Sequence, residues 1–489
     1  GMETVRGPLA RPSVRLQTVP LRGDAEKLAW LARWVPSLRK QSGHAGIVYA
    51  LTQRWTERIA EWLRKAGLDA RAYHAGLGVD EKLDSERDLM EDKLDCLVAT
   101  TALGMGYDKR DLGFVVHFHQ PASVVHYYQQ VGRAGRAIPT AYGVMLSGGD
   151  DRAITDWFID EAFPPEQRVA EILSALERSG AGLNPRELEQ ACNLRRGQIE
   201  RALKILAAEE PAPVALAEGK WRKAAPYDPA RRKALAEKMT GLRKAEQRQM
   251  DAYSRHAGCF MEFLARALDD PHAGPCGACA VCRGMPDAMR AVQPGEAAEA
   301  GLFLRGGEIV LEPRKQWPAG ALASWKGNIA AGLRAEEGRA LCVLGDGGWG
   351  EPVAQAIERG AFNAELADAL AALAKRWNPQ PAPEWVACVP SLRRPEMVDG
   401  LARAVAHRLG LPFRRVLYKV RENRPQAEME NSFQQASNLD GVFASEKCAG
   451  PVLLIDDMAD SGWTLTAAAA VLRQAGAGPV FPIVMATAT

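Results

Sequence analysis

The stretch Gly46-Ile-Val-Tyr-Ala-Leu-Thr52 opens with an apolar run that predicts a short strand buried on both faces. Three further blocks follow it: AYHAGL at 72–77, VATTALGMGYDK at 98–109 and YYQQVGRAGR at 127–136. Helical and strand-like patterns alternate from this first block to about residue 148. Such alternation predicts a parallel sheet covered by helices on both faces, and therefore an α/β fold.

The last block carries chemistry. It fits the pattern Q-x-x-G-R-x-G-R, whose polar positions include Gln129, Arg133 and Arg136. Guanidinium groups suit a γ-phosphate because phosphoryl transfer needs positive charge aimed at it. Glycine lets the backbone come close to a ligand. A lone Arg/Gly turn is commonly only a solvated loop, so the interpretation depends on the order and spacing of all four blocks.

Together the four blocks resemble the second RecA-like lobe of RecQ-family DNA helicases, and we place this lobe at residues 1–160. The resemblance implies three sets of functional residues. The catalytic residues acting on ATP are Gln129, Arg133 and Arg136. The ATP-binding residues are Gly106 and Asp108. The residues that donate to DNA phosphates are Thr100 and Thr101.

The first lobe of such a motor should carry G-x-x-x-x-G-K-[ST] and a DE-x-H box, and neither pattern occurs in the 489 residues. We therefore expect the chain to be the C-terminal part of a longer ATP-dependent 3′-to-5′ helicase of DNA repair or recombination. ATP and magnesium would bind only together with the missing lobe, so this chain alone should not hydrolyse ATP. The glycine before Met2 indicates an expression-tag remnant.

Residues 161–226 predict a winged helix-turn-helix. Asn184-Pro185-Arg186-Glu187 has an asparagine N-cap, a proline in the first turn and a glutamate three residues on, which is typical of a helix start. Val214–Lys223 predicts a two-stranded wing around Glu218-Gly219. The candidate DNA contacts are Arg195, Arg196, Arg201, Lys220, Trp221 and Arg222. Basic residues would contact phosphates and an exposed tryptophan would stack on a base. A winged helix used only for protein packing is the alternative.

Residues 227–290 combine a charged helical run with four cysteines spaced C-x16-C-x2-C-x2-C. Two C-x2-C steps bring soft thiolates to one ion, which suits tetrahedral zinc. The set includes no histidine and leaves no open position, so the predicted zinc is structural and contributes folding energy. Its ligands would be Cys259, Cys276, Cys279 and Cys282, an arrangement similar to that of RecQ proteins. An iron–sulfur cluster is the alternative.

Residues 300–380 predict a small mixed α/β extension, and residues 381–489 return to a regular α/β pattern. Within Pro451–Thr464 a buried strand ends in two carboxylates, followed by a small-residue loop and a helix start, where N–H groups bind phosphate. This segment resembles the phosphoribosyl pyrophosphate (PRPP) loop of type I phosphoribosyltransferases, and Val389–Arg394 resembles their pyrophosphate-side loop. The stretch Lys419–Gln426, followed by Asn438 and Phe443, resembles the competence-type (ComF-like) members of that family.

That resemblance implies PRPP as a further ligand, with the carboxylates holding ribose hydroxyls and loop N–H groups holding the 5-phosphate. The implied binding residues are Asp456, Asp457, Asp460, Ser461, Gly462, Trp463 and Thr464. Trp463 is bulky for a loop that closes on phosphate. A phosphoribosyltransferase-like fold kept for docking or DNA binding is therefore the alternative.

Composition limits the remaining choices. There are 62 Lys and Arg against 60 Asp and Glu, so any DNA binding must come from local patches. No apolar run reaches the length of a membrane span. Clustered and single cysteines favour a metal site in a reducing cytoplasm over disulfides. We expect single-stranded DNA and duplex junctions as partners. The competing hypotheses are a nucleotide-metabolism enzyme fused to a helicase and a non-catalytic DNA-binding scaffold.

Overall fold

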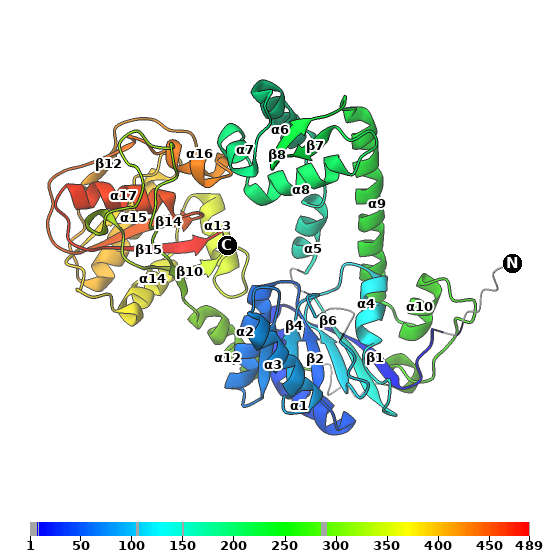
Figure 1. Ribbon diagram of the computed structural model, residues 1–489. Coiled ribbons are helices and arrows are strands. Elements are labelled where there is room, and N and C mark those ends of the chain that lie inside the picture. Colours follow the sequence, from blue (N-terminus) through cyan, green and yellow to red (C-terminus); the bar gives the residue numbers. More distant parts are fainter. Residues whose placement is uncertain (1–6, 8, 104–106, 149–150, 285–290, 489) are drawn as a thin grey trace. The chain divides into compact units, whose positions relative to one another are not determined.

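The computed structural model describes residues 7, 9–103, 107–148, 151–284 and 291–488. Contacts divide the chain into two compact units (Figure 1). Unit 1 combines residues 1–163 with 230–303, and unit 2 combines residues 164–229 with 304–489. The cysteine-containing segment therefore belongs with the N-terminal lobe. The predicted ATP-binding residue Gly106 lies outside the described residues.

Unit 1 is built on a six-stranded sheet with the order β1-β6-β5-β2-β4-β3, and all its strand pairs are parallel. The strands are β1 (Val14–Pro20), β2 (Gly46–Tyr49), β3 (Ala70–Tyr73), β4 (Cys96–Ala99), β5 (Phe114–His117) and β6 (Ala141–Ser147). The helices are α1 (Asp24–Ser42), α2 (Gln53–Lys65), α3 (Val79–Met90), α4 (Val124–Val131) and α5 (Asp151–Asp160). The predicted parallel α/β lobe is confirmed.

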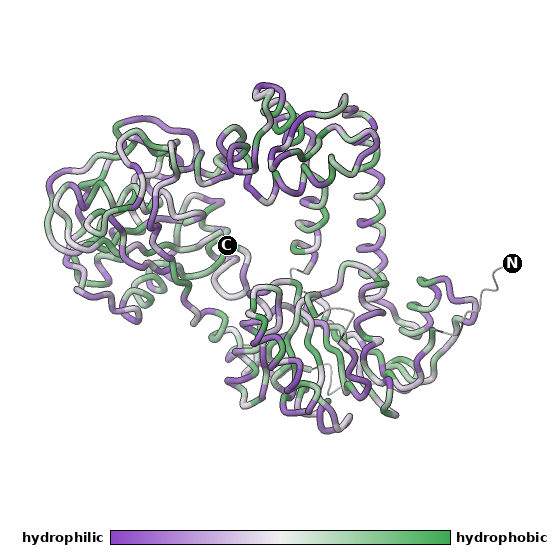
Figure 2. Tube along the Cα trace, in the orientation of Figure 1, coloured by the Kyte–Doolittle hydropathy of each residue, from purple (hydrophilic) through white to green (hydrophobic). Residues whose placement is uncertain are grey.

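Both faces of this sheet are buried, as the apolar strands require. Ile47 and Val48 point to opposite faces because strand side chains alternate, and both are inaccessible to solvent. The face of Ile47 packs against a core that includes Leu89 of α3 and Tyr127 of α4. Hydrophobic residues accordingly run along the strands of this sheet (Figure 2).

The segment of unit 1 that follows the lobe is helical. Its helices are α9 (Pro229–Ser254), α10 (Phe260–Ala267) and α11 (Ala280–Arg283), and α12 (Pro294–Gly306) begins in this segment and ends in unit 2. Tyr253, near the end of α9, is buried in the same core as Tyr127, and their hydroxyl oxygens are 3.1 Å apart. The helix that precedes the arginine-rich turn is thereby fixed to the segment that carries the cysteines.

Unit 2 begins with what we call the helix–hairpin domain, residues 164–229. It contains α6 (Glu166–Ser179), α7 (Pro185–Ala191), α8 (Arg196–Ala207) and the antiparallel pair β7 (Val214–Ala217) and β8 (Lys220–Lys223). The helix start predicted at Asn184 is present as a capping box: Glu187 N donates to Asn184 Oδ1 (2.9 Å), and Asn184 N donates to Glu187 Oε2 (2.8 Å).

The C-terminal domain, residues 304–489, has a five-stranded sheet with the order β11-β14-β15-β10-β9. Its strands are β9 (Ile309–Leu311), β10 (Gly338–Val343), β11 (Trp385–Cys388), β14 (Val452–Ala459) and β15 (Val480–Thr487), with β12 (Leu417–Lys419) and β13 (Phe443–Ser445) as a separate pair. Its helices are η2 (Ala331–Leu333), α13 (Gly350–Arg359), α14 (Ala364–Trp377), α15 (Pro395–Leu409), η3 (Gln426–Glu428), α16 (Ser432–Ser437) and α17 (Trp463–Gln474).

Residues 300–380, predicted as a small mixed α/β extension, share one sheet with residues 381–489. Strand β10 pairs in parallel with β15, and β9 pairs antiparallel with β10, so both belong to the sheet of residues 381–489. The apolar face of α14 packs into the same core as α15, with Leu370 and Leu401 both fully buried. Sequence separation concealed this pairing, because β15 comes at the end of the chain. None of the helices described here is long and apolar enough to cross a bilayer.

One buried cation organises the connection from β4 to β5, which has no helix in its described residues. Lys109 is 3% exposed, and its Nζ lies 3.1 Å from Asp92 Oδ2 and 3.0 Å from Asp111 Oδ1. It also donates to the carbonyl oxygen of Met90 (3.2 Å). His44 Nδ1 lies 3.2 Å from each carboxylate. This group has the side chains of a metal site, but the lysine already supplies the positive charge.

These neighbours lower the pKa of the Asp92 carboxyl group. Burial alone would raise its pKa, but hydrogen bonds from Ala45 N, His44 and Lys109 outweigh burial and hold the pKa below its usual range. A folded-state pKa below the unfolded value gives stability that is present above the unfolded pKa and is lost as the pH falls through the folded one. Unit 1 should therefore lose stability as the pH drops below about 4.

We predict that Lys109→Met destabilises unit 1 by about 3 kcal/mol, because removing one partner leaves two carboxylates facing each other without their cation. The substitution should also weaken the acid dependence due to Asp92. Denaturant unfolding at pH 7 and at pH 4 measures both effects. Lys93→Met is the matched control, because Lys93 pairs with Glu91 in solvent and its loss should change little. Equal stability of the two variants would contradict the assigned role of Lys109.

Candidate functional site

The arginine-rich turn follows α4, whose N-cap Ser123 accepts a hydrogen bond from His126 N (3.2 Å). Arg133 is half-buried and turns inward: its guanidinium donates to the carbonyl oxygens of Tyr107 (2.9 Å) and Leu103 (3.5 Å). These bonds join the turn to the block at 98–109. The two blocks that the sequence placed in one ATP-related group are therefore in direct contact.

Arg136, in contrast, is exposed. Its Nε donates to Gly132 O (3.1 Å), and its Nη1 lies 2.5 Å from Asp108 Oδ1 in an ion pair on the surface. Two predicted ATP residues, Arg136 and Asp108, thus contact each other. Gln129 is also exposed, on the last turn of α4.

The neighbouring Gln130 was missed by sequence reasoning. Its Oε1 lies 2.7 Å from Nε2 of His117, the last residue of β5. Burial lowers the pKa of His117 to about 4, and the bond to Gln130 offsets this effect only in part, so the ring is neutral at physiological pH. A polar pair inside the core therefore fixes the helix from which the arginine turn starts. A histidine ending an apolar strand was the available signal.

Glycine is required at one position of the turn. Gly135 has a φ of +68°, and a Cβ built there would lie 2.9 Å from Ser13 Oγ. Ser13 Oγ donates to Gly135 O (2.7 Å), and Arg11 Nη1 donates to Gly132 O (2.7 Å). Because Arg11 and Ser13 directly precede β1, the turn lies at the amino-terminal edge of the sheet.

The two threonines lie at the other edge, where β4 ends. Thr100 is 9% exposed, and its Oγ1 accepts a hydrogen bond from Ala102 N (3.2 Å). Thr101 is exposed. Of the two predicted DNA contacts, only Thr101 presents its side chain to solvent.

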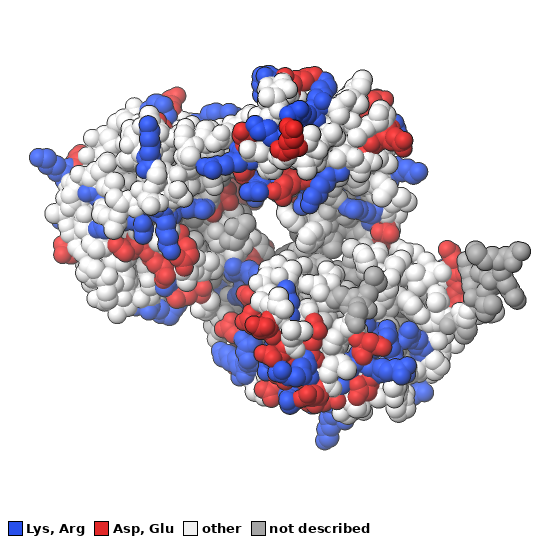
Figure 3. Space-filling model, in the orientation of Figure 1, with Lys and Arg blue, Asp and Glu red and all other residues white. Residues whose placement is uncertain are grey.

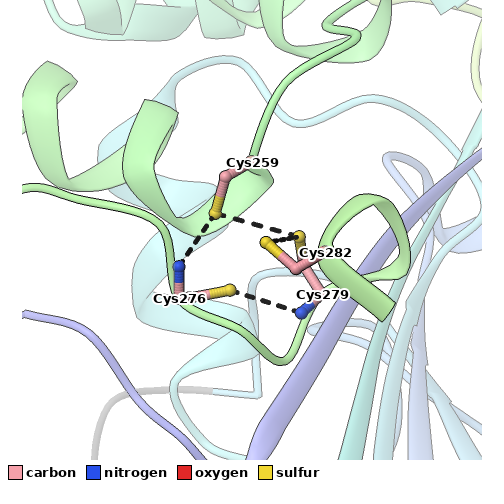
Figure 4. A group of neighbouring side chains, drawn as sticks. All are labelled: Cys259, Cys276, Cys279 and Cys282. Atoms are coloured by element: carbon pink, nitrogen blue, oxygen red, sulfur yellow. Dashed lines mark hydrogen bonds between the residues drawn. The ribbon is translucent and has the colours of Figure 1, made fainter. Parts of the chain in front are cut away.

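The four cysteines come together (Figure 4). Their sulfur atoms all lie within 4.8 Å of one another, with Cys279 Sγ 3.8 Å from Cys259 Sγ and 3.5 Å from Cys282 Sγ. Four ligands at the Zn–S distance of about 2.3 Å stand about 3.8 Å apart in a tetrahedron, so this spacing fits a zinc ion. The predicted ligands thus form one cluster.

Backbone N–H groups surround the sulfurs as they do around thiolates. Cys276 N points at Cys259 Sγ (3.2 Å), and Ala278 N and Cys279 N point at Cys276 Sγ (3.4 and 3.3 Å). Burial works against ionisation and raises the pKa of Cys276 to about 12, whereas N–H donors outweigh burial at Cys279 and lower its pKa to about 7. A metal that binds here therefore displaces protons.

The predicted DNA contacts of the helix–hairpin domain are charged but mostly paired. Arg196 pairs with Glu200 (2.8 Å), Lys220 with Glu187 (3.6 Å) and Arg222 with Glu218 (3.5 Å). Arg201 of α8 is exposed. Lys and Arg side chains are interleaved with Asp and Glu over the visible surface (Figure 3), in keeping with the small net charge.

Two of the DNA candidates lie differently from expectation. Trp221 is half-buried and packs against the core of the helix–hairpin domain, because β8 bridges back to Leu183, so it is not a free stacking surface. Arg195 precedes α8 and turns toward the C-terminal domain, with its Nε 3.4 Å from Glu430 Oε2. Neither feature has a signal in the local sequence.

The predicted PRPP-binding segment lines a cavity of about 380 Å³. Asp456 is 5% exposed, and burial followed by repulsion from Asp457 raises its pKa well above the usual range. Arg394 Nη1 lies 2.9 Å from Asp457 Oδ2, which brings the predicted loop 389–394 to the carboxylates. Lys419 also lines the cavity, and burial lowers its pKa.

Packing in the core accounts for the bulky side chain at Trp463. It is 3% exposed and starts α17, with its ring stacked on Trp317 at 5.8 Å and the guanidinium carbon of Arg314 5.3 Å from the ring centroid. Arg314 also donates twice to Ser461 O (2.8 and 2.6 Å). Gly462 has a φ of +79°. Trp463 is therefore part of the core, and it also lines the cavity together with the other predicted residues, Asp460 to Gly462 and Thr464.

Comparison with known proteins assigns the lobe. Residues 26–138 match the family "Helicase conserved C-terminal domain". The chain is 38% identical over 167 residues to the ATP-dependent DNA helicase RecQ of Pasteurella multocida, covering 34% of this chain and 26% of that protein. It is 44% identical over 104 residues to the RecQ-like DNA helicase blm-1 of Caenorhabditis elegans, covering 21% of this chain and 10% of that protein.

In a third relative the matched region is a larger share of the relative's own length. The ATP-dependent DNA helicase RecQ of Synechocystis is 31% identical over 171 residues, which is 34% of this chain and 35% of that protein. The chain thus spans about a third or less of the length of these relatives. What the matches support is a helicase C-terminal domain of RecQ type at the N-terminal end of this chain. The arginine turn and the block at 98–109 both lie within the matched region.

We predict that the purified chain contains zinc in a 1:1 ratio, measured by elemental analysis, and that Cys276→Ser lowers this ratio and the melting temperature, because the ion contributes folding energy. Cys342→Ser is the matched control, since Cys342 is buried far along the sequence and outside the cluster. Iron with absorbance in the visible range, in place of zinc, would contradict the assignment.

Proposed function

We propose that this chain is part of a RecQ-like ATP-dependent 3′-to-5′ DNA helicase, in which it supplies catalytic arginines to ATP held by another lobe. The observation that carries the proposal is the joined pair of loops: Arg133 binds Tyr107 O and Arg136 binds Asp108 within the helicase-type domain. This geometry presents one anchored and one exposed guanidinium at the same edge of the sheet.

The two arginines suit different tasks. Arg133 is held by backbone carbonyls and shapes the loop that contains Tyr107. Arg136 is paired only with the exposed carboxylate of Asp108, and a surface ion pair of this kind is weak enough to exchange. A γ-phosphate carries more charge than Asp108 and would draw the Arg136 guanidinium to itself, where it stabilises the charge of the transition state.

The remaining parts fit DNA handling. Thr101 at the carboxyl edge of β4, together with Arg196, Arg201, Lys220 and Arg222 of the helix–hairpin domain, is proposed to contact the phosphate backbone. We interpret that domain as a winged helix and the four-cysteine cluster as a structural zinc site. DNA repair or recombination, with single-stranded DNA and duplex junctions as substrates, is the proposed setting.

The cavity in the C-terminal domain favours a second activity, the binding of PRPP with magnesium. Its lining combines the carboxylates Asp456 and Asp457, which suit a magnesium-bound ribose, with the cationic side chains of Arg394 and Lys419, which suit diphosphate. We propose a phosphoribosyltransferase-like domain here. A scaffold without ligand binding is the competing function.

Calorimetric titration with PRPP and magnesium distinguishes a PRPP-binding domain from a scaffold without ligand binding. We predict binding by the native chain and at least tenfold weaker binding by the double variant Asp456→Asn with Asp457→Asn, because the amides no longer attract the cation. Asp399→Asn is the control, since its carboxylate pairs with Arg403 and Arg415 outside the cavity lining. If the folded native chain gives no heat with PRPP, the result contradicts PRPP binding and favours a scaffold that binds no ligand.

Arginine substitution tests the helicase proposal. The chain alone should hydrolyse no ATP. Joined to the ATP-binding lobe of a RecQ relative, it should gain DNA-stimulated ATPase activity, and Arg136→Ala should lower kcat by about 10³-fold, the size of effect of an arginine finger. Arg110→Ala, a nearby exposed position, is the control. A kcat that stays within threefold in Arg136→Ala would refute the role of Arg136.

A further inference from the structure

The turn between α7 and α8 is docked onto the C-terminal domain through one buried amide. Asn431 is 5% exposed, and the two N–H groups of its Nδ2 lie within hydrogen-bond distance of three carbonyl oxygens, those of Glu189 (2.9 Å), Cys192 (2.9 Å) and Leu194 (3.0 Å). Its Oδ1 meanwhile accepts from Gln434 N (2.9 Å) and caps α16. Carbonyls at the end of α7 lack partners within the helix, so this side chain satisfies them.

A reciprocal pair reinforces the contact. Asn193 Nδ2 donates to Glu428 O (2.6 Å), and Glu430 N donates to Asn193 Oδ1 (2.8 Å). In a helix-turn-helix, this turn positions the second helix for DNA. The segment that would present α8 to a DNA groove is therefore occupied by residues 428–431.

Arg195 connects this contact to the cavity. It follows the docked turn and lines the cavity together with Asp456, Asp457 and Arg394. Its Nε lies 3.3 Å from Glu430 O, and its Nη2 lies 3.8 Å from Asp460 Oδ2. Asp460 also accepts from Gln435 Nε2 (3.1 Å). A side chain of the helix–hairpin domain thus completes the wall of a site otherwise formed by the C-terminal domain.

The charges that line the cavity indicate that an anionic ligand would hold Arg195 in the cavity wall. Five cationic side chains line it against three carboxylates. The cations are Arg195, Arg393, Arg394, Lys419 and Arg424, and the carboxylates are Asp456, Asp457 and Asp460. An anionic ligand with several phosphate oxygens would bring negative charge next to Arg195 and hold it in place. A DNA phosphate would draw the same guanidinium outward.

We propose that Arg195 is shared between a phosphate-ligand site in the C-terminal domain and the DNA-binding surface of the helix–hairpin domain, so that each ligand weakens the binding of the other. The proposal rests on ligand binding in the cavity, the second activity given above. Ligand binding stabilises the contact already formed at Asn431 and thereby lowers DNA affinity. By linkage, DNA lowers ligand affinity by the same factor.

The test measures DNA affinity of the complete chain by fluorescence anisotropy, with a duplex that bears a single-stranded tail, at fixed salt. PRPP with magnesium should raise the Kd for DNA about fivefold or more in the native chain, the lower range of allosteric coupling. Asn431→Asp retains the acceptor that caps α16 but removes the amide donor, so it should bind DNA more tightly and lose the response to PRPP.

Asn363→Asp is the matched control. Asn363 caps α14 through the same kind of bond, from Leu366 N to its Oδ1 (2.9 Å), and makes no contact with the helix–hairpin domain in the described structure. It should bind DNA and respond to PRPP as the native chain does. Asn193→Ala is a second test variant, which breaks the reciprocal pair without adding charge and should also lose the response.

Calorimetry on the same samples separates two kinds of failure. PRPP binding together with a DNA Kd that changes less than twofold would overturn the shared site and leave the ligand site standing. An undiminished response in both Asn431→Asp and Asn193→Ala would overturn the docking contact as its cause. No PRPP binding by the native chain would overturn the ligand site and, with it, the competition.

Discussion

One buried ammonium group, that of Lys109, holds in place the part of the lobe that carries the proposed ATP-related residues. Parallel strands are usually joined by a helix, yet the described residues between β4 and β5 form none. Lys109 replaces that support by binding two carboxylates, Asp92 and Asp111, and the last carbonyl of α3. Because Tyr107 and Asp108 directly precede it, the position of Lys109 sets where those residues lie.

From that anchor the contacts continue to the arginine turn and then to the cysteine cluster. Arg133 and Arg136 bind Tyr107 and Asp108, and the turn follows α4. Tyr127 of α4 contacts Tyr253, which leads into the segment of the four cysteines. The predicted zinc site is therefore tied to the helix that carries the catalytic candidates. A metal-stabilised module at that place would keep α4 from shifting when phosphate pulls on Arg136.

The sequence was most informative where a local pattern has a local cause. Apolar runs predicted the strands of the lobe, and the residues after Asn184 predicted the capping box at the start of α7. The cysteine spacing predicted the four-cysteine cluster. What failed depended on partners distant in the chain. Strand β10 joined a sheet completed by β15, Trp221 packed inward because β8 bridges Leu183, and Arg195 found its carboxylates at Glu430 and Asp460. No short window of sequence contains both members of such pairs.

Lys109 shows most clearly what could not be predicted from the sequence, namely which side chains are buried. It stands in the block at 98–109, whose resemblance to helicases pointed to nucleotide and DNA, but its side chain serves the fold. Conversely Arg136, which looks like any Arg beside glycine, is the one exposed guanidinium of the described arginine turn. Burial, which the sequence does not give, distinguishes the structural cation Lys109 from Arg136, the proposed catalytic one.

Strand separation tests whether this chain works as the second motor lobe of a RecQ-like helicase. The chain joined to the ATP-binding lobe of a RecQ relative would be given a labelled duplex with a 3′ single-stranded tail, and the same duplex with a 5′ tail. A RecQ-type motor that moves 3′ to 5′ should unwind only the 3′-tailed duplex, and only with ATP. ATP hydrolysis stimulated by DNA without unwinding of either duplex, or unwinding that favours the 5′ tail, would contradict it.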